Sequence, residues 1–216
     1  MNWIYGITTA GERSTLPATK KSLMAAGFGA PLIFNDPGVG AFGNWVLAAW
    51  QLALRAPNAD RYAVFQDDVL ACKGLRTYLE KSPYPDKGYL NLYLMDGTIS
   101  KEGVSWGWLP AHPQERGKGA QGLVFNNDAL HALLAQQYLV DHPKAVRSPT
   151  SNLDGAVTTA LANAGWREWV HYPSLLQHMN EGTTIISNRG NHDHTAPTFP
   201  GEGVDIGELI KGATTT

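Results

Sequence analysis

The first 68 residues alternate strand and helix signals in the order β-α-β-α-β. Short, mainly apolar runs at residues 3–9, 31–35 and 62–66 predict strands, and two segments with helical spacing of apolar residues separate them. Strands joined by helices in this way pair in parallel, and the helices cover the faces of the sheet. The pattern therefore predicts an α/β fold, in which ligands bind at the carboxyl ends of the strands.

The two helices between these strands have recognisable ends. Ser14 or Thr15 can cap the first helix at its start, and Gly27 is placed to end it. Asn44 is expected to cap the second helix, which Pro57 ends. The apolar residues of the second helix are expected to share one buried side: Trp45, Ala49, Trp50, Ala53 and Leu54.

The second half of the chain continues the alternation less regularly. Strands are expected at residues 89–95, 105–109, 120–125 and 166–171, and helices at about 128–138 and from Asn152 or Asp154 to Asn163. No repeat or linker divides the chain. We therefore expect one domain over residues 1–187 and a tail, 188–216, that packs on the domain or is partly disordered.

Composition limits the partners and the setting. The chain has 216 residues, 43% of them hydrophobic, which is enough to form a sizeable core. A net charge of −2 gives no overall attraction to nucleic acid, although a local basic groove is compatible with it. The single cysteine, Cys72, excludes an internal disulfide. Because no membrane-length apolar run or signal-peptide pattern occurs, a cytoplasmic protein is expected.

Two adjacent carboxylates, Asp67 and Asp68, follow the strand at 62–66. Neighbouring acids at a buried strand end repel each other and are costly to desolvate. A divalent cation is the usual reason for such a pair, and Mg²⁺ or Mn²⁺ with carboxylate ligands also grips phosphate oxygens. The alternative is a surface turn, where Asp is common.

Five segments, taken in order, carry a family resemblance. They are residues 5–9 with Arg13, residues 65–69, residues 122–125, residues 152–154 and residues 172–178. Their order and spacing resemble nucleotide-sugar glycosyltransferases of the GT-A fold, including small enzymes of bacteriophages and bacteria. The resemblance implies a single Rossmann-like domain with a mixed, mainly parallel sheet, Mn²⁺ or Mg²⁺, and a UDP-sugar donor of glucose or another hexose.

The resemblance assigns the metal site to two residues. The acid-x-acid motif of the family falls on Gln66-Asp67-Asp68, where Gln66 departs from the pattern. Asp68 is then the metal ligand, and Gln66 or Asp67 contacts the ribose or a metal-bound water. His178 matches a metal ligand near the end of the domain, and an imidazole suits that role. The alternative for His178 is a core histidine satisfied by a hydrogen bond.

Asp154 matches the position of the family's catalytic base. Inverting sugar transfer needs a carboxylate to take the proton of the acceptor hydroxyl. The alternative is a helix acid that the dipole favours at an N-terminus. In a retaining enzyme, Asp154 would instead orient the acceptor.

The remaining candidates contact the donor or the acceptor. Residues at the ends of the first strands are expected to bind the nucleotide, although a helix cap explains Asn44 equally well: Thr8, Thr9, Arg13, Asp36 and Asn44. Core packing is the alternative to a stacking platform for Trp106 and Trp108. Arg116 and Lys118 are expected to close over the phosphates or to form a solvated loop. His192 and His194 are two residues apart, but a loop is expected there rather than a second metal site.

Three function classes follow. The first is a glycosyltransferase, and its expected acceptor is 5-hydroxymethylcytosine or another hydroxymethylpyrimidine in double-stranded DNA, as for a bacteriophage enzyme in the host cytoplasm, or a bacterial glycan. A DNA acceptor requires a basic surface, for which the second half offers these residues: Arg116, Lys118, Lys144, Arg147, Arg167 and Arg189. The second class is a nucleotidyltransferase. The third is a non-catalytic binder of nucleotide sugars, which the departure at Gln66 favours.

Overall fold

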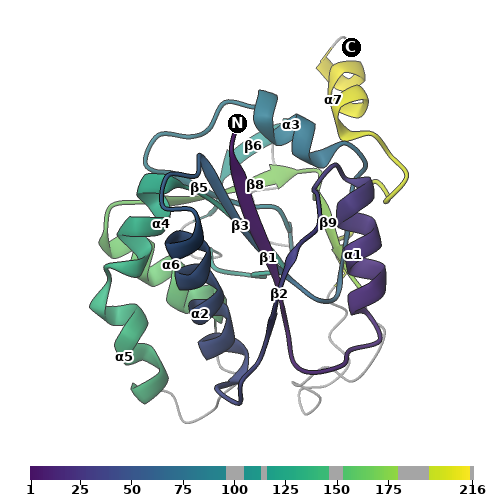
Figure 1. Cartoon of the computed structure of the whole chain (residues 1–216). Helices are drawn as coiled ribbons and strands as arrows, with labels where there is room; N and C mark the ends of the chain where they lie inside the picture. The colour runs from purple at the N-terminus through teal and green to yellow at the C-terminus, as the bar shows by residue number, and fades with distance from the viewer. Residues whose placement is uncertain (96–104, 113–115, 146–152, 180–194, 215–216) are drawn as a thin grey trace.

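A mixed sheet forms the centre of the computed structural model, which describes residues 1–95, 105–112, 116–145, 153–179 and 195–214 (Figure 1). Within these residues the sheet has seven strands: β1 (Trp3–Thr9), β2 (Leu32–Asn35), β3 (Arg61–Gln66), β5 (Gly88–Asn91), β6 (Gly107–Pro110), β7 (Gly122–Asn126) and β8 (Arg167–Tyr172). Their order is β2-β1-β3-β7-β5-β8-β6. Only β7 and β6 run against the others. The sheet is therefore mainly parallel, as predicted.

Helices cover both faces of the sheet. They are α1 (Leu16–Ala25), α2 (Gly40–Arg55), α3 (Leu75–Lys81), α4 (Asn127–Leu134), α5 (Gln137–Ala145), α6 (Leu153–Asn163) and α7 (Ile206–Thr214). Figure 1 shows α2, α4, α5 and α6 on one side and α1, α3 and α7 on the other. None of the described helices is long and apolar enough to cross a membrane.

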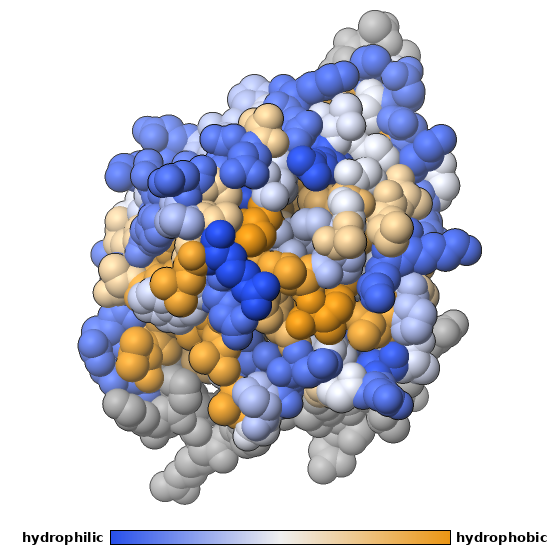
Figure 2. All heavy atoms as spheres, in the orientation of Figure 1, coloured by the Kyte–Doolittle hydropathy of each residue, from blue (hydrophilic) through white to orange (hydrophobic). Residues whose placement is uncertain are grey.

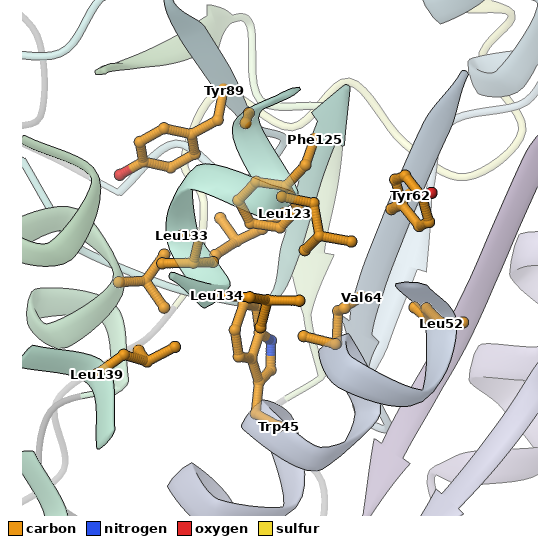
Figure 3. Close-up of a cluster of buried hydrophobic side chains, with 14 of the residues drawn as sticks. Trp45, Leu52, Tyr62, Val64, Tyr89, Leu123, Phe125, Leu133, Leu134 and Leu139 are labelled. Atoms are coloured by element: carbon orange, nitrogen blue, oxygen red, sulfur yellow. The ribbon is translucent and has the colours of Figure 1, made fainter. Parts of the chain in front are cut away.

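The core on the α2 side is the larger of two apolar layers (Figure 3). Trp45 of α2 is fully buried and meets Phe125 of β7 edge to face, with ring centroids 6.1 Å apart. Tyr89 of β5 stacks on the same Phe125 ring at 5.7 Å. Such aromatic pairs add to the stabilisation from burial, so this cluster fixes α2 and β7 against each other.

The start of α2 differs from the prediction. The helix begins at Gly40, four residues before Asn44, and Val39 is its N-cap residue. The Asp36 carboxylate accepts the backbone N–H groups of residues 38–40 and so satisfies the amides that lead into the helix.

The buried side of α2 matches the prediction in part. Trp45, Ala49 and Ala53 are buried as predicted, whereas Trp50 and Leu54 are 42% and 73% exposed. Figure 2 shows apolar residues at the surface on this side of the molecule.

Two further elements end earlier than predicted. The expected helix at 128–138 is divided into α4 and α5, with Ala135 as the C-cap of α4. The expected strand at 89–95 stops as β5 at Asn91, because the Asn91 side chain accepts the N–H of Tyr93 at 3.1 Å and replaces a ladder partner.

A small second sheet lies beside the large one. It pairs β4 (Val69–Ala71) with β9 (Leu176–His178) in antiparallel register, so that Val69 lies opposite His178. The described part of the tail then packs on the domain. The Gln177 side chain accepts the N–H of Ala196 at 2.7 Å, and Ala196 and Ile206 are buried. The small sheet therefore joins residues from distant parts of the sequence.

Candidate functional site

A cleft of about 500 Å³ lies at the edge of the sheet where β1 and β3 end. It is lined by eleven of the fourteen predicted site residues: Thr8, Thr9, Arg13, Asp36, Asn44, Gln66, Asp67, Asp68, Lys118, Asp154 and His178. The fold thus gathers side chains that are up to 170 positions apart in the sequence, counted from Thr8 to His178. Two groups of residues on opposite sides of β3 and β7 form its polar walls.

The first group, called here the Asp68 wall, comprises Thr9, Arg13, Asp67, Asp68 and His178. Its two carboxylates occupy the tight connection between β3 and β4. Thr19 of α1 braces this connection, since its hydroxyl donates to the carbonyl of Asp67 at 2.9 Å and accepts the N–H of Val69 at 3.0 Å. The β4–β9 pairing brings His178 alongside.

Asp68 lies between the guanidinium of Arg13 and the imidazole of His178. Its Oδ2 atom is 3.3 Å from Arg13 Nη2 and 3.3 Å from His178 Nε2. Its other oxygen, Oδ1, is buried and has no hydrogen-bond partner among the described residues. A buried carboxylate oxygen without a partner is costly, and a bound ligand or ion removes that cost.

Asp67 is held more completely than Asp68. The Thr9 hydroxyl donates to its Oδ2 atom, and Arg13 Nε lies 3.5 Å from the same oxygen. Burial raises the pKa of the Asp67 carboxyl, the Thr9 and Arg13 contacts oppose that shift, and the charge of Asp68 adds to it. These contacts make Asp67 a fixed part of the wall.

Several predicted donor contacts also have structural partners. The Asn44 amide donates to the carbonyls of Thr9 and Phe34, at 3.2 and 2.9 Å, and so joins the ends of β1 and β2. Asn44 therefore does not cap α2. Thr8 donates to the carbonyl of Phe65 at 3.2 Å, and Asp36 accepts the amides that lead into α2, as described above. These three residues line the cleft while holding its floor.

The second group, called here the Asp154 wall, comprises Gly117, Lys118, Gly119 and Asp154, with Asn91 and Glu168 behind them. Asp154 lies in the first turn of α6, and its Oδ2 atom accepts the N–H of Gly119 at 2.7 Å. Burial raises the pKa of the Asp154 carboxyl, against the effect of the amide hydrogen bonds from Gly119 and Ala120.

Three of the candidates, Trp106, Trp108 and Arg116, lie outside the lining of the cleft. Trp108 packs edge to face on His171, with centroids 4.9 Å apart, which is the packing alternative. Trp106 is 40% exposed and meets Tyr172 at 6.2 Å. Both belong to the region of β6, at the far edge of the sheet from β1. Arg116 is exposed, and His192 and His194 lie outside the described residues.

Sequence reasoning missed three polar residues of the site. Glu168 and Asn91 support the Asp154 wall from β8 and β5, and each looks in sequence like an ordinary strand residue. Gln121 precedes β7 and lines the cleft, and within the part of the chain that the structure describes its buried Oε1 atom has no partner. Unsatisfied buried oxygens are found only after the chain is folded, so no sequence signal indicates them.

The donor set suits a metal ion that keeps several non-protein ligands. Among the described residues, no three His, Cys, Asp or Glu side chains gather around one point. Asp68 and His178 alone would provide one carboxylate and one imidazole, with Asp68 Oδ1 still unpaired within the described part of the chain. Mg²⁺ in phosphate-binding sites commonly takes one or two carboxylates, with water and substrate phosphates completing its shell. The residues present therefore fit such an ion.

Comparison with known proteins identifies the fold. No family model and no curated protein matches the sequence. Among solved structures, a glycosyltransferase involved in the glycosylation of the major capsid of PBCV-1 matches with a TM-score of 0.50 at 14% identity, covering 83% of this chain and 94% of that one. A197 from STIV matches with a TM-score of 0.46 at 13% identity, covering 88% of this chain and 100% of that one. The chain thus has the Rossmann-like, GT-A-like α/β fold of the first of these proteins.

Proposed function

We propose that this protein is a metal-dependent glycosyltransferase, which moves glucose or another hexose from a UDP-sugar to a hydroxyl acceptor. The observation that carries the proposal is the Asp68 carboxylate in the cleft. One of its oxygens is buried and has no partner in the residues that the structure describes, and the other lies 3.3 Å from an imidazole nitrogen of His178. A carboxylate that follows a parallel strand, with an imidazole from the antiparallel strand β9 beside it, suits a cation that holds a diphosphate.

Asp68 and His178 would hold Mn²⁺ or Mg²⁺ in this proposal. When bound, the ion supplies positive charge that stabilises the diphosphate leaving group. Arg13 already lies 3.3 Å from Asp68 and 3.5 Å from Asp67, so its guanidinium is placed to share that task on the same side of the cleft. Thr8, Thr9, Asn44 and Gln66 would contact the nucleoside from the floor.

Asp154 is the proposed catalytic base. The acceptor oxygen forms a bond to the anomeric carbon, the bond from that carbon to the diphosphate breaks, and the acceptor proton passes to the Asp154 carboxylate. A raised pKa strengthens a carboxylate as a base, and burial raises the pKa of Asp154. The amide of Gly119 on Oδ2 fixes the orientation of the carboxylate in the wall.

For the acceptor, a hydroxymethylpyrimidine in double-stranded DNA stands first and a bacterial glycan second. Arg116 is exposed and directly precedes Gly117 of the cleft lining, so DNA phosphate would meet it there. Arg167 begins β8, at the sheet edge opposite the cleft, so it does not extend that basic surface. Arg147 and Arg189 lie outside the described residues.

The test is a donor-hydrolysis screen. The protein is incubated with each nucleotide sugar in Mn²⁺, in Mg²⁺ and in chelator, with and without DNA that contains 5-hydroxymethylcytosine. We expect metal-dependent release of UDP from one donor, lost in Asp68→Ala. Acceleration by the modified DNA, with a mass gain of one hexose per modified base, identifies that acceptor.

Two other results would overturn the proposal. Pyrophosphate release from a nucleoside triphosphate and a sugar phosphate would indicate a nucleotidyltransferase. Calorimetric binding of a nucleotide sugar without any turnover would indicate a non-catalytic binder, as the departure from an acid at Gln66 allows.

A further inference from the structure

We infer that Glu168 and Asn91 are positioning residues that hold the turn of residues 117–119 in shape, so that Lys118 meets the phosphates of the donor. The inference rests on the proposed function for the identity of the ligand. Neither Glu168 nor Asn91 lines the cleft, so both act through the turn in front of them.

The two residues form a buried polar frame behind the turn. Glu168 is 3% exposed, and its two oxygens have different partners. Oε2 accepts the N–H of Gly117 at 2.7 Å, and Oε1 accepts the Asn91 amide at 2.8 Å. The Asn91 amide also donates to the carbonyl of Lys118 at 3.2 Å. The frame therefore holds the backbone on both sides of the Lys118 peptide unit.

The backbone of the turn fits closely against its surroundings. Gly117 and Gly119 have φ angles of 73° and 78°, in the left-handed region that favours glycine. A Cβ atom on Gly117 would lie 2.8 Å from Thr158 Oγ1, and one on Gly119 would lie 2.4 Å from the ring of Tyr93. A side chain at either glycine would therefore clash, and the one long side chain of the turn, Lys118, lines the cleft.

Burying the Glu168 carboxylate costs free energy, which indicates that the frame has a function at the site. Burial raises the pKa of the Glu168 carboxyl, the hydrogen bonds from Asn91 and Gly117 oppose the shift, and the nearby charge of Asp154 adds to it. An apolar residue in the middle of β8 would avoid this burial of a charge. The gain from Glu168 is the fixed turn, because each buried amide of the turn needs an acceptor.

Glu168→Gln tests the inference with little change of shape. The two carboxylate oxygens of Glu168 have different partners, and glutamine replaces one of these oxygens with an NH2 group, so either Gly117 or Asn91 then faces a second donor. We expect the KM for the donor to rise roughly tenfold, with kcat changed by less than about twofold. Amide hydrogen exchange at Gly117, followed by NMR, is expected to become at least about tenfold faster.

Two further variants separate positioning from general loss of stability. Lys118→Met removes the charge that the turn presents. The double variant with Glu168→Gln is expected to have a KM less than about twofold higher than that of Lys118→Met alone. Tyr84→Phe is the matched control, because the Tyr84 hydroxyl accepts the N–H of Asn126 at 3.0 Å and lies away from the cleft lining. This control is expected to lower the melting temperature without changing the KM.

The outcomes distinguish this inference from the proposed function. A wild-type protein that turns over a donor, with an unchanged KM in Glu168→Gln, overturns the inference alone. Full additivity of the Glu168 and Lys118 substitutions, or slow exchange retained at Gly117, also overturns it. Absence of donor turnover in the wild-type protein overturns the proposed function, and the role of Lys118 toward phosphate with it.

Discussion

The two walls of the cleft satisfy their buried carboxylates in different ways. In the Asp68 wall, Arg13 and His178 lie against the carboxylate oxygens, so cationic or titratable side chains balance the charge. In the Asp154 wall, the backbone amides of Gly117 and Gly119 hold Glu168 and Asp154, with the Asn91 side-chain amide on the other oxygen of Glu168. Side chains that balance charge can exchange their partner for a ligand, whereas backbone amides cannot leave. The Asp68 wall is therefore suited to bind a ligand, and the Asp154 wall is suited to orient one.

Asp154→Asn is expected to have the largest effect on activity, because it keeps the orientation of the side chain in the Asp154 wall but abolishes proton transfer. The amide oxygen still accepts from Gly119, but the side chain can no longer take a proton. We expect kcat to fall by about 10² to 10⁴ with the nucleotide affinity kept, as measured by steady-state kinetics and calorimetry. A drop in affinity with normal kcat would make Asp154 a scaffold residue like Glu168.

Lowering the pH is expected to change the stability of the protein in opposite directions through two residues of β8, His171 and Glu168. His171 is fully buried, its Nδ1 bonded to the Pro173 carbonyl at 2.7 Å and its Nε2 to the Tyr78 hydroxyl at 2.6 Å. Burial lowers the pKa of His171 to about 4 from a usual value of 6.5. The folded protein thus binds this proton less readily than the unfolded chain does.

The contribution of His171 to stability is therefore complete above pH 6.5 and is lost as the pH falls toward 4, by about 3 kcal/mol in total. The pKa of Glu168 is raised, so protonation of Glu168 in acid works in the opposite direction. Urea unfolding from pH 7.5 to 4.5 measures the net slope. We expect a shallower loss of stability in His171→Gln, and an unchanged slope would contradict the buried neutral imidazole.

Thr19→Val is expected to have a smaller effect on stability, confined to the Asp68 wall. It removes the hydroxyl between the Asp67 carbonyl and the Val69 N–H and leaves both backbone groups buried, at a cost of about 2 kcal/mol in the free energy of unfolding. Denaturant titration measures the cost, and Thr19→Ser, which keeps the hydroxyl, is the control. Equal stability of the Val and Ser variants would show that the brace is not needed.

The sequence indicated the Asp68 wall better than the Asp154 wall, for a physical reason. Adjacent acids after an apolar strand are unusual enough to mark Asp67 and Asp68, and the first three strands follow from local periodicity. Glu168 lies in a strand of alternating character, and its partners Asn91 and Gly117 are 77 and 51 positions away. Contacts at such separations leave no local pattern.

The buried side of α2 was predicted only in part, for a related reason. Trp45, Ala49 and Ala53 are buried as predicted, whereas Trp50 and Leu54 are exposed, and Ala48 and Leu52 complete the buried side. Periodicity identified the helix and most of its buried side, but not the limits of that side. The start of α2 was misplaced because Asp36, four residues before the helix, satisfies the amides that lead into it.

The β4–β9 pairing also bears on when the protein becomes competent during translation. Val69 leaves the ribosome early, but its ladder partner His178 follows more than a hundred residues later. A nascent chain that has emerged only through β8 contains all seven strands of the large sheet and still lacks one member of the Asp68 wall. The Asp68 wall therefore depends on a residue that is synthesised after every strand of the large sheet, so its completion comes later than that of the sheet.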